Sequence, residues 1–369
     1  MISERALAWL RLAMVRGIGP VTGRKLVRAV GDIDALWMQS VHRWKPVDGI
    51  GPQLLKALGE NSDRAVESML ELCRQKDIGL LCPDDPAWPD LLQPCDDAPL
   101  VLFFQGNAAC LNHDRMLAVV GARRASRESS LITRRWCRYL SDRQVCIVSG
   151  MAFGIDAAAH GGALEGESPT VAVLGCGLAA LSEQQQRQVQ AIAARGCVIS
   201  EFFPQLTARP EHFPRRNRII AGLSHAALVM EADVKSGSLI TARRAIDYGR
   251  EVFSVPGSVL AGHHAGCHQL IREGALLVES ADEVLQAMGW LQAGSEHVAA
   301  GKSYHPTDAN ESKLLQELAS GSMHLDHLAE TCGLTVPELS PIVLRLELQG
   351  VIERLPGSRY MLSVELHRT

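Results

Sequence analysis

The chain has 369 residues, of which 47% are hydrophobic and 21% are charged, and its formal net charge is −4 at pH 7. This composition excludes a disordered chain and a uniformly basic nucleic-acid coat, and it predicts two or three globular domains. No segment is apolar enough to suggest an export signal or a membrane span, and the ten cysteines are scattered without a C-x-x-C pair. We therefore expect a cytoplasmic protein with reduced thiols and no membrane partner.

Residues 1–82 are predicted to form short helices interrupted by two similar turns, Arg16–Pro20 and Asp48–Pro52, each containing Gly-Ile-Gly-Pro. Such turns are typical of a helix-hairpin-helix or SAM-like domain, in which backbone N–H groups at a helix N-terminus face a DNA phosphate. Three basic residues would add charge to the first copy: Arg24, Lys25 and Arg28. A helical packing module with no ligand fits the same pattern, because a pair of glycines is a weak signal.

Residues 83–292 alternate apolar runs with helical segments. This alternation predicts a Rossmann-like domain, a parallel sheet with helices on both faces, whose ligands bind beyond the carboxyl ends of the strands. The expected strands are Leu117–Val120, Val145–Ser149, Thr170–Leu174, Val198–Ser200, Ala227–Met230, Glu251–Val255 and Ala275–Val278. The loops that follow these strands are therefore the places to search for a site.

The loop after the first expected strand combines small and basic residues. Gly121 permits a tight turn, Ser126 is a plausible N-cap of the next helix, and Arg123 and Arg124 lie between them. This loop could hold an anion beside a helix N-terminus.

The loop after the second expected strand turns on Gly150 and Gly154 directly into a helix. Its backbone N–H groups would form an anion nest, although no Lys-Ser/Thr follows the glycines as in a P-loop. Asp156 and His160 lie four residues apart on that helix. They would serve either in acid-base chemistry or as a polar pair that anchors the helix.

A dinucleotide-binding pattern follows the third expected strand. Gly175–Ala180 fits G-x-G-x-x-A, and Glu201 closes the next strand where a ribose-binding acid would stand. The pattern falls at the third strand rather than the first, which weakens this interpretation.

The most informative segment, Phe213–Ser224, places three arginines and an asparagine between an aromatic residue and an apolar helix start. Phe213 offers a flat face for a base, and Pro214 stiffens the entry to the segment. Each guanidinium presents a planar fork of donors that suits phosphate oxygens. The polar residues concerned are Arg215, Arg216, Asn217 and Arg218, with Arg209 just upstream. An arginine-rich helix start on a solvated surface fits the same run.

Two further loops follow the fifth and sixth expected strands. Ser236, Gly237, Ser238 and Thr241 can cap a helix and offer N–H and hydroxyl donors to a phosphate, and Lys235 adds a mobile charge. The run His263–His268 contains imidazole and thiol groups, but it has no partner pair elsewhere in the chain. We expect it to be a loop rather than a zinc site, and we expect no metal.

The C-terminal part is predicted to be a separate domain. Residues 293–307 are small and polar and form a linker. Residues 308–369 are predicted to be a winged helix, with a hairpin after three helices, Glu311–Leu318, Leu325–Cys332 and Val336–Leu348. The charged residues of the third helix are Glu338, Arg345 and Glu347. They are too few and too acidic to read a DNA groove, so we expect a protein-contact or regulatory module.

Taken together, these patterns closely resemble the DNA-processing protein A family (DprA, also called Smf). The resemblance spans nearly the whole chain and predicts an α/β fold: a Rossmann-like parallel sheet core, an N-terminal helical domain and a C-terminal winged helix. It rests on five strings, at Gly121–Ser126, Ser149–His160, Ser200–Glu201, Phe213–Leu223 and Glu231–Ala242.

The resemblance implies a non-catalytic protein, with no cofactor, that binds single-stranded DNA. Members protect incoming strands in natural transformation, promote loading of the RecA recombinase in recombination, and form a homodimer through the Rossmann-like domain. By resemblance, Arg123 would lie in the DNA pocket, Gly150 and Gly154 would line it, and Phe213 would stack on a base. The full set of predicted DNA-binding residues is Arg123, Arg124, Ser126, Gly150, Gly154, Arg209, Phe213, Arg215, Arg216, Asn217, Arg218, Lys235, Ser236, Gly237 and Ser238.

Two departures from the family pattern affect this set. Pro210 stands where many relatives carry a lysine, so Arg209 or Arg215 would have to make that contact. Leu181–Glu183 replaces a Tyr-Pro that many relatives have after the third-strand glycines, which puts that edge of the pocket in question.

Two other functional classes fit parts of the sequence. A Rossmann-like nucleotide-binding hydrolase, such as a phosphoribohydrolase, would use both glycine loops for phosphates and would depend on Glu201, Asp156 or Glu231. A transcription regulator would bind duplex DNA through the winged helix, and the weak charge of its third helix argues against this function.

Overall fold

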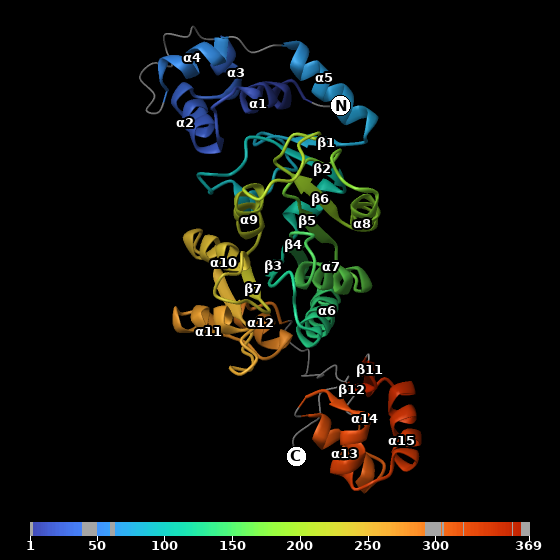
Figure 1. Cartoon of the computed structure of the whole chain (residues 1–369). Coiled ribbons are helices and arrows are strands. Elements are labelled where there is room, and N and C mark those ends of the chain that lie inside the picture. Colours follow the sequence, from blue (N-terminus) through green and yellow to red (C-terminus); the bar gives the residue numbers. More distant parts are fainter. Residues whose placement is uncertain are drawn as a thin grey trace. The chain divides into compact units, whose positions relative to one another are not determined.

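The structure is a computed structural model that describes residues 3–38, 50–59, 63–291, 304, 306–319, 321–355 and 357–362. The chain divides into two compact units, Met1–Trp290 and Leu291–Thr369 (Figure 1). Most of the expected linker 293–307 and the first two residues of the second expected turn, Asp48 and Gly49, lie outside the described residues. Within the described residues, no helix is long and apolar enough to cross a membrane.

The first unit begins with five helices: α1 (Glu4–Met14), α2 (Pro20–Val30), α3 (Ile33–Met38), α4 (Pro52–Gly59) and α5 (Asp63–Gln75). The first predicted turn is confirmed as the connection between α1 and α2, where Gly17 adopts a φ of 91° and Pro20 starts the helix. Arg24 is buried and donates to the carbonyl of Ala98 at 3.1 Å, and Arg28 pairs with Asp96 at 3.1 Å. These two arginines tie α2 to the segment between residues 82 and 101, and Arg24 is buried there, so the expectation that Arg24 would add charge toward DNA is wrong.

The centre of the first unit is a nine-stranded sheet of order β1-β2-β6-β5-β4-β3-β7-β8-β9. All seven expected strands are confirmed to within two residues and form its parallel part: β3 (Met116–Val120), β4 (Cys146–Ser149), β5 (Thr170–Val173), β6 (Cys197–Ser200), β7 (Ala226–Val229), β8 (Glu251–Ser254) and β9 (Leu276–Leu277). Two antiparallel strands that the sequence did not reveal complete one edge, β1 (Gly79–Leu81) and β2 (Leu102–Gly106). Strand β1 joins this sheet although it precedes the expected domain boundary at residue 82.

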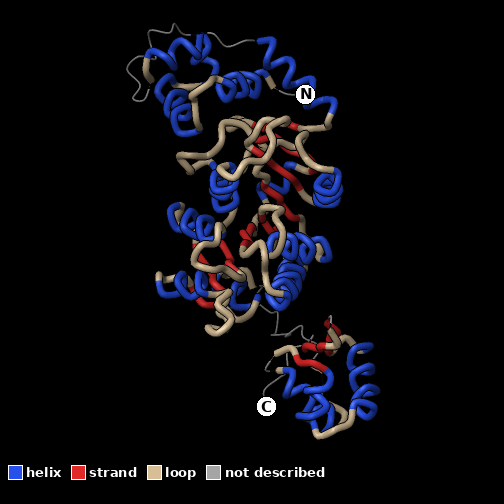
Figure 2. The backbone as a smooth tube through the Cα atoms, in the orientation of Figure 1, coloured by secondary structure: helices blue, strands red, loops and turns tan. Residues whose placement is uncertain are grey.

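Helices cover both faces of this sheet, as Figure 2 shows by colour. They are α6 (Arg127–Ser141), α7 (Ile155–Glu165), α8 (Glu183–Ala193), α9 (His212–Gly222), α10 (Ser238–Asp247), α11 (Ala265–Arg272) and α12 (Ala281–Ala287), with short 3-10 turns at Asp90–Leu92 and Ala108–Asn112. The central strands are buried on both sides, which is why they appear in the sequence as unbroken apolar runs such as Met116–Val120.

The second unit is a winged helix, as predicted. Its helices are α13 (Ala309–Leu318), α14 (Leu325–Cys332) and α15 (Val336–Leu348), and its strands are β10 (Met323–His324), β11 (Ile352–Leu355) and β12 (Arg359–Leu362) in the order β10-β12-β11. A buried apolar core that includes Leu314, Leu328 and Leu339 joins the three helices.

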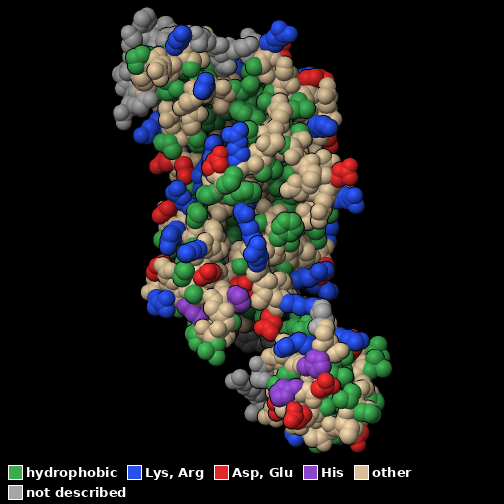
Figure 3. All heavy atoms as spheres, in the orientation of Figure 1, with side chains coloured by type: hydrophobic (Ala, Val, Ile, Leu, Met, Phe, Trp, Pro, Cys, Tyr) green, Lys and Arg blue, Asp and Glu red, His purple; other side chains and the backbone are tan. Residues whose placement is uncertain are grey.

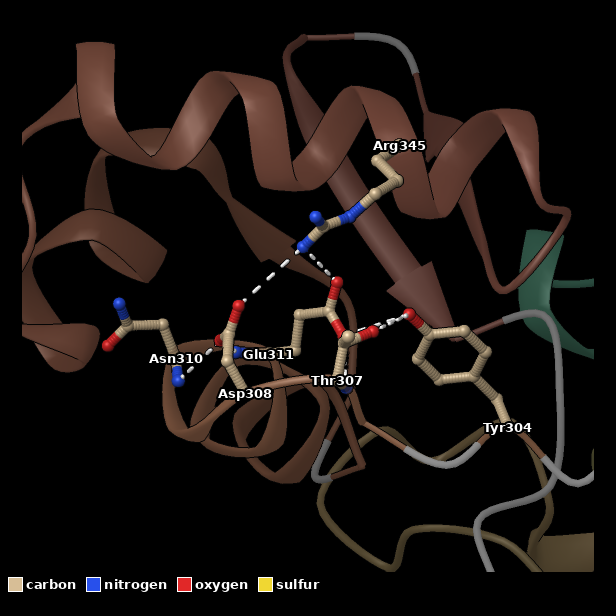
Figure 4. Close-up of polar contacts among 6 residues, drawn as sticks. All are labelled: Tyr304, Thr307, Asp308, Asn310, Glu311 and Arg345. Carbon is tan, nitrogen blue, oxygen red and sulfur yellow. Dashed lines mark hydrogen bonds and ion pairs between the residues drawn. The ribbon is translucent and has the colours of Figure 1, made fainter.

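A polar cluster holds the start of α13 against α15 (Figure 4). The carboxylate of Glu311 is fully buried and accepts hydrogen bonds from the hydroxyl of Tyr304 at 2.8 Å and the N–H of Thr307 at 2.6 Å, and it pairs with Arg345. Burial alone would raise the pKa of Glu311, but these hydrogen bonds and the Arg345 charge outweigh burial and lower it. The arginine of α15 is thus committed to its own domain.

Candidate nucleic-acid interface

A pocket of about 590 Å³ opens at the carboxyl ends of β3 and β7. The chain runs from β3 outward to β6 on one side and returns to β7, β8 and β9 on the other, so the strand order reverses at this point. Such a switch point leaves a crevice where open α/β sheets bind their ligands. The loop Gly121–Arg124 after β3, the loop after β7, and helix α9 all contribute to the lining.

Nine of the predicted site residues line this pocket: Arg123, Arg124, Phe213, Arg216, Asn217, Lys235, Ser236, Gly237 and Ser238. The other six, Ser126, Gly150, Gly154, Arg209, Arg215 and Arg218, do not line it. The structure therefore brings together the loops that the sequence singled out, but it separates the members of the arginine run.

The rim of the pocket carries an aromatic ring beside mobile positive charge. The guanidinium of Arg123 lies 4.7 Å from the centroid of the Phe213 ring, a cation–π distance. Arg124 and Lys235 are exposed on the loops to either side. Figure 3 shows Lys and Arg side chains gathered with hydrophobic ones along this face of the first unit. Charge and an apolar ring therefore meet at the pocket mouth.

Helix α9 directs the arginine run in different directions, because successive residues of a helix are rotated by about 100°. Arg216 is only 3% exposed and donates to the carbonyl oxygens of Gly150 and Val173. Burial lowers the pKa of Arg216 to about 10, although nearby Asp156 raises it. Arg216 lines the floor of the pocket, where its Nη1 is engaged by backbone carbonyls and its Nε by the side chain of Asn217.

Arg215 and Arg218, three residues apart on α9, turn toward Glu201 instead. The buried Glu201 carboxylate accepts from Arg215 at 3.0 Å and from the buried Arg218 at 2.5 Å. The prediction that Arg218 holds a phosphate is therefore wrong in this geometry. Arg215 stays half exposed but is also paired. Pro210 lines the pocket but has no charge to offer a phosphate. The exposed Arg209 is therefore the remaining candidate for the contact that a lysine makes in many relatives.

The glycines serve mainly to let backbone segments approach one another. A Cβ at Gly154, whose φ is 76°, would lie 2.7 Å from the carbonyl oxygen of Arg123, and the N–H of Ile155 donates to Ala122 at 3.2 Å. At Gly150 the carbonyl oxygen, rather than the N–H, makes a contact, because it accepts a hydrogen bond from Arg216. The expected anion nest of N–H groups is therefore occupied in part by the chain itself.

The dinucleotide pattern has no room for a pyrophosphate. The N–H of Gly177 donates to Leu206 at 2.8 Å, and a Cβ on Gly177 would overlap the carbonyl oxygens of Phe203 and Pro204. A Cβ on Gly175 would lie 2.9 Å from the Phe213 ring. The segment Leu181–Glu183, which replaces the Tyr-Pro of many relatives, caps α8 through Ser182. Packing, rather than cofactor binding, accounts for these glycines, and Glu201 is committed to arginines.

Asp156 and His160 do not form a dyad, because each has its own partner. Asp156 accepts from the N–H of Ala152 at 3.3 Å, and burial raises its pKa despite the opposing charge of Arg216. The ring of His160 lies 2.9 Å from the hydroxyl of Thr170, and burial lowers the pKa of His160 to about 4. Both residues hold α7 in place.

The start of α10 supplies a cluster of hydroxyl groups. The Ser236 and Ser238 hydroxyls lie 2.7 Å apart, and Asn217 donates to the carbonyl of Gly237 at 3.1 Å. Thr241, which the sequence grouped with these serines as a hydroxyl donor for a phosphate, lines the pocket, and its buried hydroxyl has no hydrogen-bond partner among the described residues.

The carboxylate of Glu231 explains the placement of Ser126. Both of its oxygens accept from the N–H of Ser126, at 3.1 and 3.0 Å, and the Ser126 hydroxyl in turn caps α6. Glu231 is thus engaged in holding the Arg123 loop. The described residues contain no group of three or more His, Cys, Asp or Glu arranged to hold a metal, and Cys267 of the histidine-rich run is buried in α11.

The fold and the site define a two-part α/β protein, in which a Rossmann-like sheet carries a basic and aromatic pocket at its switch point and a winged helix follows. Models of two families match this chain: DNA recombination-mediator protein A over residues 79–289 and the DprA winged helix domain over residues 298–358. The first match covers more than half of the chain, which therefore belongs to the DprA/Smf family, as the resemblance predicted.

Individual relatives support this assignment. The chain is 34% identical to protein Smf of Synechocystis, over 97% of this chain and 98% of the relative, and 43% identical to the DNA processing protein DprA of Streptococcus pneumoniae, over 54% and 71%. The crystal structure of S. pneumoniae DprA aligns with a TM-score of 0.68 at 33% identity, covering 78% of this chain and 98% of that one. The Helicobacter pylori DprA structure, described for its single-stranded DNA binding mode, aligns with a TM-score of 0.51 at 27% identity, over 57% and 95%.

Proposed function

We propose that this chain binds single-stranded DNA, without cleaving it, in the pocket between β3 and β7. The observation that carries the proposal is the Arg123–Phe213 pair at the pocket mouth, flanked by exposed Arg124 and Lys235. Single strands need a positive path for the backbone and an aromatic face on which a base can stack. The relative from H. pylori is described as binding single-stranded DNA.

In this proposal each rim residue has one task. A base stacks on Phe213 in place of the Arg123 guanidinium, which moves from the ring to a phosphate. Arg124, Lys235 and the hydroxyls at the start of α10 donate hydrogen bonds to the neighbouring phosphates. Arg216 shapes the floor beneath the base rather than touching the strand, because its Nη1 donates to two backbone carbonyls and its Nε donates to Asn217.

The first experiment is fluorescence anisotropy of a labelled oligothymidine at several salt concentrations. We expect tight binding that single strands displace and that duplex DNA, AMP and NAD do not. Phe213→Ala should weaken binding about 10-fold at an unchanged salt slope, because stacking carries no charge. Arg123→Ala should reduce the slope by about 0.7 log units per log salt, because one phosphate contact is lost.

Arg187→Ala provides the matched control, since Arg187 is an exposed arginine of α8 outside the pocket. Displacement of the oligomer by AMP or NAD, or normal binding by both rim variants, would reject the proposal. Displacement would favour the nucleotide-binding hydrolase that the glycine loops also suggested.

We further propose that the protein protects incoming strands and promotes RecA loading during natural transformation and recombination, as a homodimer through the Rossmann-like domain. Strand β9 supports the dimer, because it ends the sheet and exposes Leu276 and Leu277 by 46% and 47%. Light scattering should give twice the mass of one chain for wild type and one chain for Leu277→Glu. The rate of RecA filament assembly on a strand coated with single-strand-binding protein should rise when the protein is added.

A further inference from the structure

One phenylalanine stands apart from the other six of the chain. Phe153 is 76% exposed, whereas each of the others is buried or half-buried. A single exposed apolar side chain needs no special explanation by itself. What distinguishes Phe153 is the backbone that carries it and the loop that it adjoins.

The turn that carries Phe153 is held rigidly between β4 and α7. Met151 adopts a φ of 54°, a left-handed conformation that is uncommon for a residue with a side chain, and Gly154 has a φ of 76°. The N–H of Ala152 donates to Asp156 and that of Ile155 donates to Ala122. The Phe153 ring therefore projects from a backbone fixed on both sides.

Its two neighbours place Phe153 at the mouth of the pocket. Ala152, on one side, lines the pocket. Gly154, on the other side, lies so close to the Arg123 loop that an added Cβ would come within 2.7 Å of the Arg123 carbonyl oxygen. Arg123 and Arg124 are both exposed on that loop. An exposed ring on a firmly held turn thus stands next to the loop that carries both arginines.

We propose that Phe153 is a second base-stacking platform, outside the pocket, for the nucleotide that leaves Phe213 past Arg123 and Arg124. This inference rests on the proposed function, because it needs a strand in the pocket. Aromatic rings stack on any base, and a fixed ring loses little conformational freedom on binding. Phe153 would then set the direction in which the strand leaves the pocket and lengthen the binding site.

The test measures affinity for oligothymidines of graded length with the full chain. Phe153→Ala should bind long oligomers about 10-fold more weakly than wild type and bind the shortest oligomers, which occupy only the pocket, as wild type does. Phe213→Ala should weaken both. Phe153→Trp is the matched control and should retain wild-type affinity, because it keeps a stacking face.

A second arm replaces the bases outside the pocket by abasic nucleotides. The difference between wild type and Phe153→Ala should disappear on these oligomers, since their phosphates remain but nothing can stack. Because Phe153 is exposed, the urea unfolding midpoint of Phe153→Ala should equal that of wild type. Equal midpoints would exclude misfolding as the cause of weaker binding.

The outcomes separate this inference from the proposed function. If wild type binds no single strand, both fail together. If wild type binds and Phe213→Ala weakens binding, while Phe153→Ala behaves as wild type at every length, only this inference is overturned. A change in oligomeric state with unchanged affinity would also overturn it, because Phe153 would then be a protein contact.

Discussion

The pocket of the first unit and helix α15 of the second unit use their arginines in opposite ways. Arg123 and Arg124 stay exposed beside an aromatic ring, whereas Arg345 is tied to the buried Glu311. The outer side of α15 exposes Leu344 and Leu348 by 56% and 80%. A winged helix is often read as a DNA-binding fold, yet here the α/β sheet carries the charge. The exposed side chains, rather than the fold name, are therefore the basis on which we propose a nucleic-acid surface.

The same contrast holds inside the pocket. Arg123 can exchange a ring for a phosphate, while Arg216 already satisfies two backbone carbonyls. Proximity to the pocket therefore does not make an arginine a ligand contact. The predictions below separate structural arginines from binding ones, and then one unit from the other.

The largest effect is expected for Arg216→Ala. The substitution leaves the carbonyls of Gly150 and Val173 without their donor and removes the cation nearest to the buried Asp156. The free energy of unfolding of the first unit should fall by roughly 3 kcal/mol or more, as measured by urea denaturation. Arg124→Ala is the contrast and should leave unfolding unchanged. A stable Arg216→Ala protein with weak DNA binding would instead make Arg216 a ligand contact.

The next effect is a dependence of stability on pH that is specific to the first unit. Because burial lowers the pKa of His160 from 6.5 to about 4, the unfolded state binds a proton in this window and the folded state does not. His160 therefore reduces stability as pH falls from 6.5 to 4, by up to about 3 kcal/mol. Asp156, whose pKa is raised, acts in the opposite direction.

His160→Asn isolates this contribution, since an amide can still bond Thr170 but does not titrate. Tryptophan fluorescence reports the first unit alone, because all six tryptophans lie there, at positions 9, 37, 44, 88, 136 and 290. In the second unit the lowered pKa of Glu311 contributes stability above about pH 4.5, its ordinary pKa, and this stability is lost as the pH falls below that value, because the unfolded state then binds a proton more readily than the folded state. Equal pH profiles for wild type and His160→Asn would contradict the assignment.

A smaller loss of stability is expected for Glu201→Gln. The neutral amide leaves the buried Arg218 without its carboxylate, which should cost about 2 kcal/mol of unfolding free energy. Affinity for single-stranded DNA should stay within about 2-fold of wild type, because Glu201 does not line the pocket. A loss of catalytic turnover in this variant, with the fold intact, would revive the enzyme hypothesis.

The smallest effect is expected from removal of residues 291–369. Helix α15 offers no free arginine among its described residues, so the first unit should bind oligothymidine with the affinity and salt slope of the full chain. Fluorescence anisotropy at several salt concentrations measures both quantities. A shallower slope in the shortened protein would show that the winged helix contacts phosphates.

The parallel strands and the winged-helix elements could be predicted because their apolar residues form clear runs or recur at regular spacing in the sequence. Strands β1 and β2 could not be predicted. They pair antiparallel at the edge of the sheet, so they are not part of the alternation of strand and helix that marks the parallel strands in the sequence. At the pocket, the loops that the sequence singled out do meet, but the directions of their side chains could not be predicted. Thr241 was among the hydroxyl donors that the sequence suggested, but its burial and lack of a partner are visible only in three dimensions.

By itself, the sequence determined the order of elements, the family and the loops that meet at the switch point, since these depend on local periodicity and short motifs. Only the tertiary structure decided which arginines remain available. Within one turn of α9, Arg216 donates to backbone carbonyls and Arg218 pairs with Glu201. Arg123, on another loop, lies over the ring of Phe213. Burial and pairing depend on the partner that each side chain meets across the fold, and those partners lie far away in the sequence.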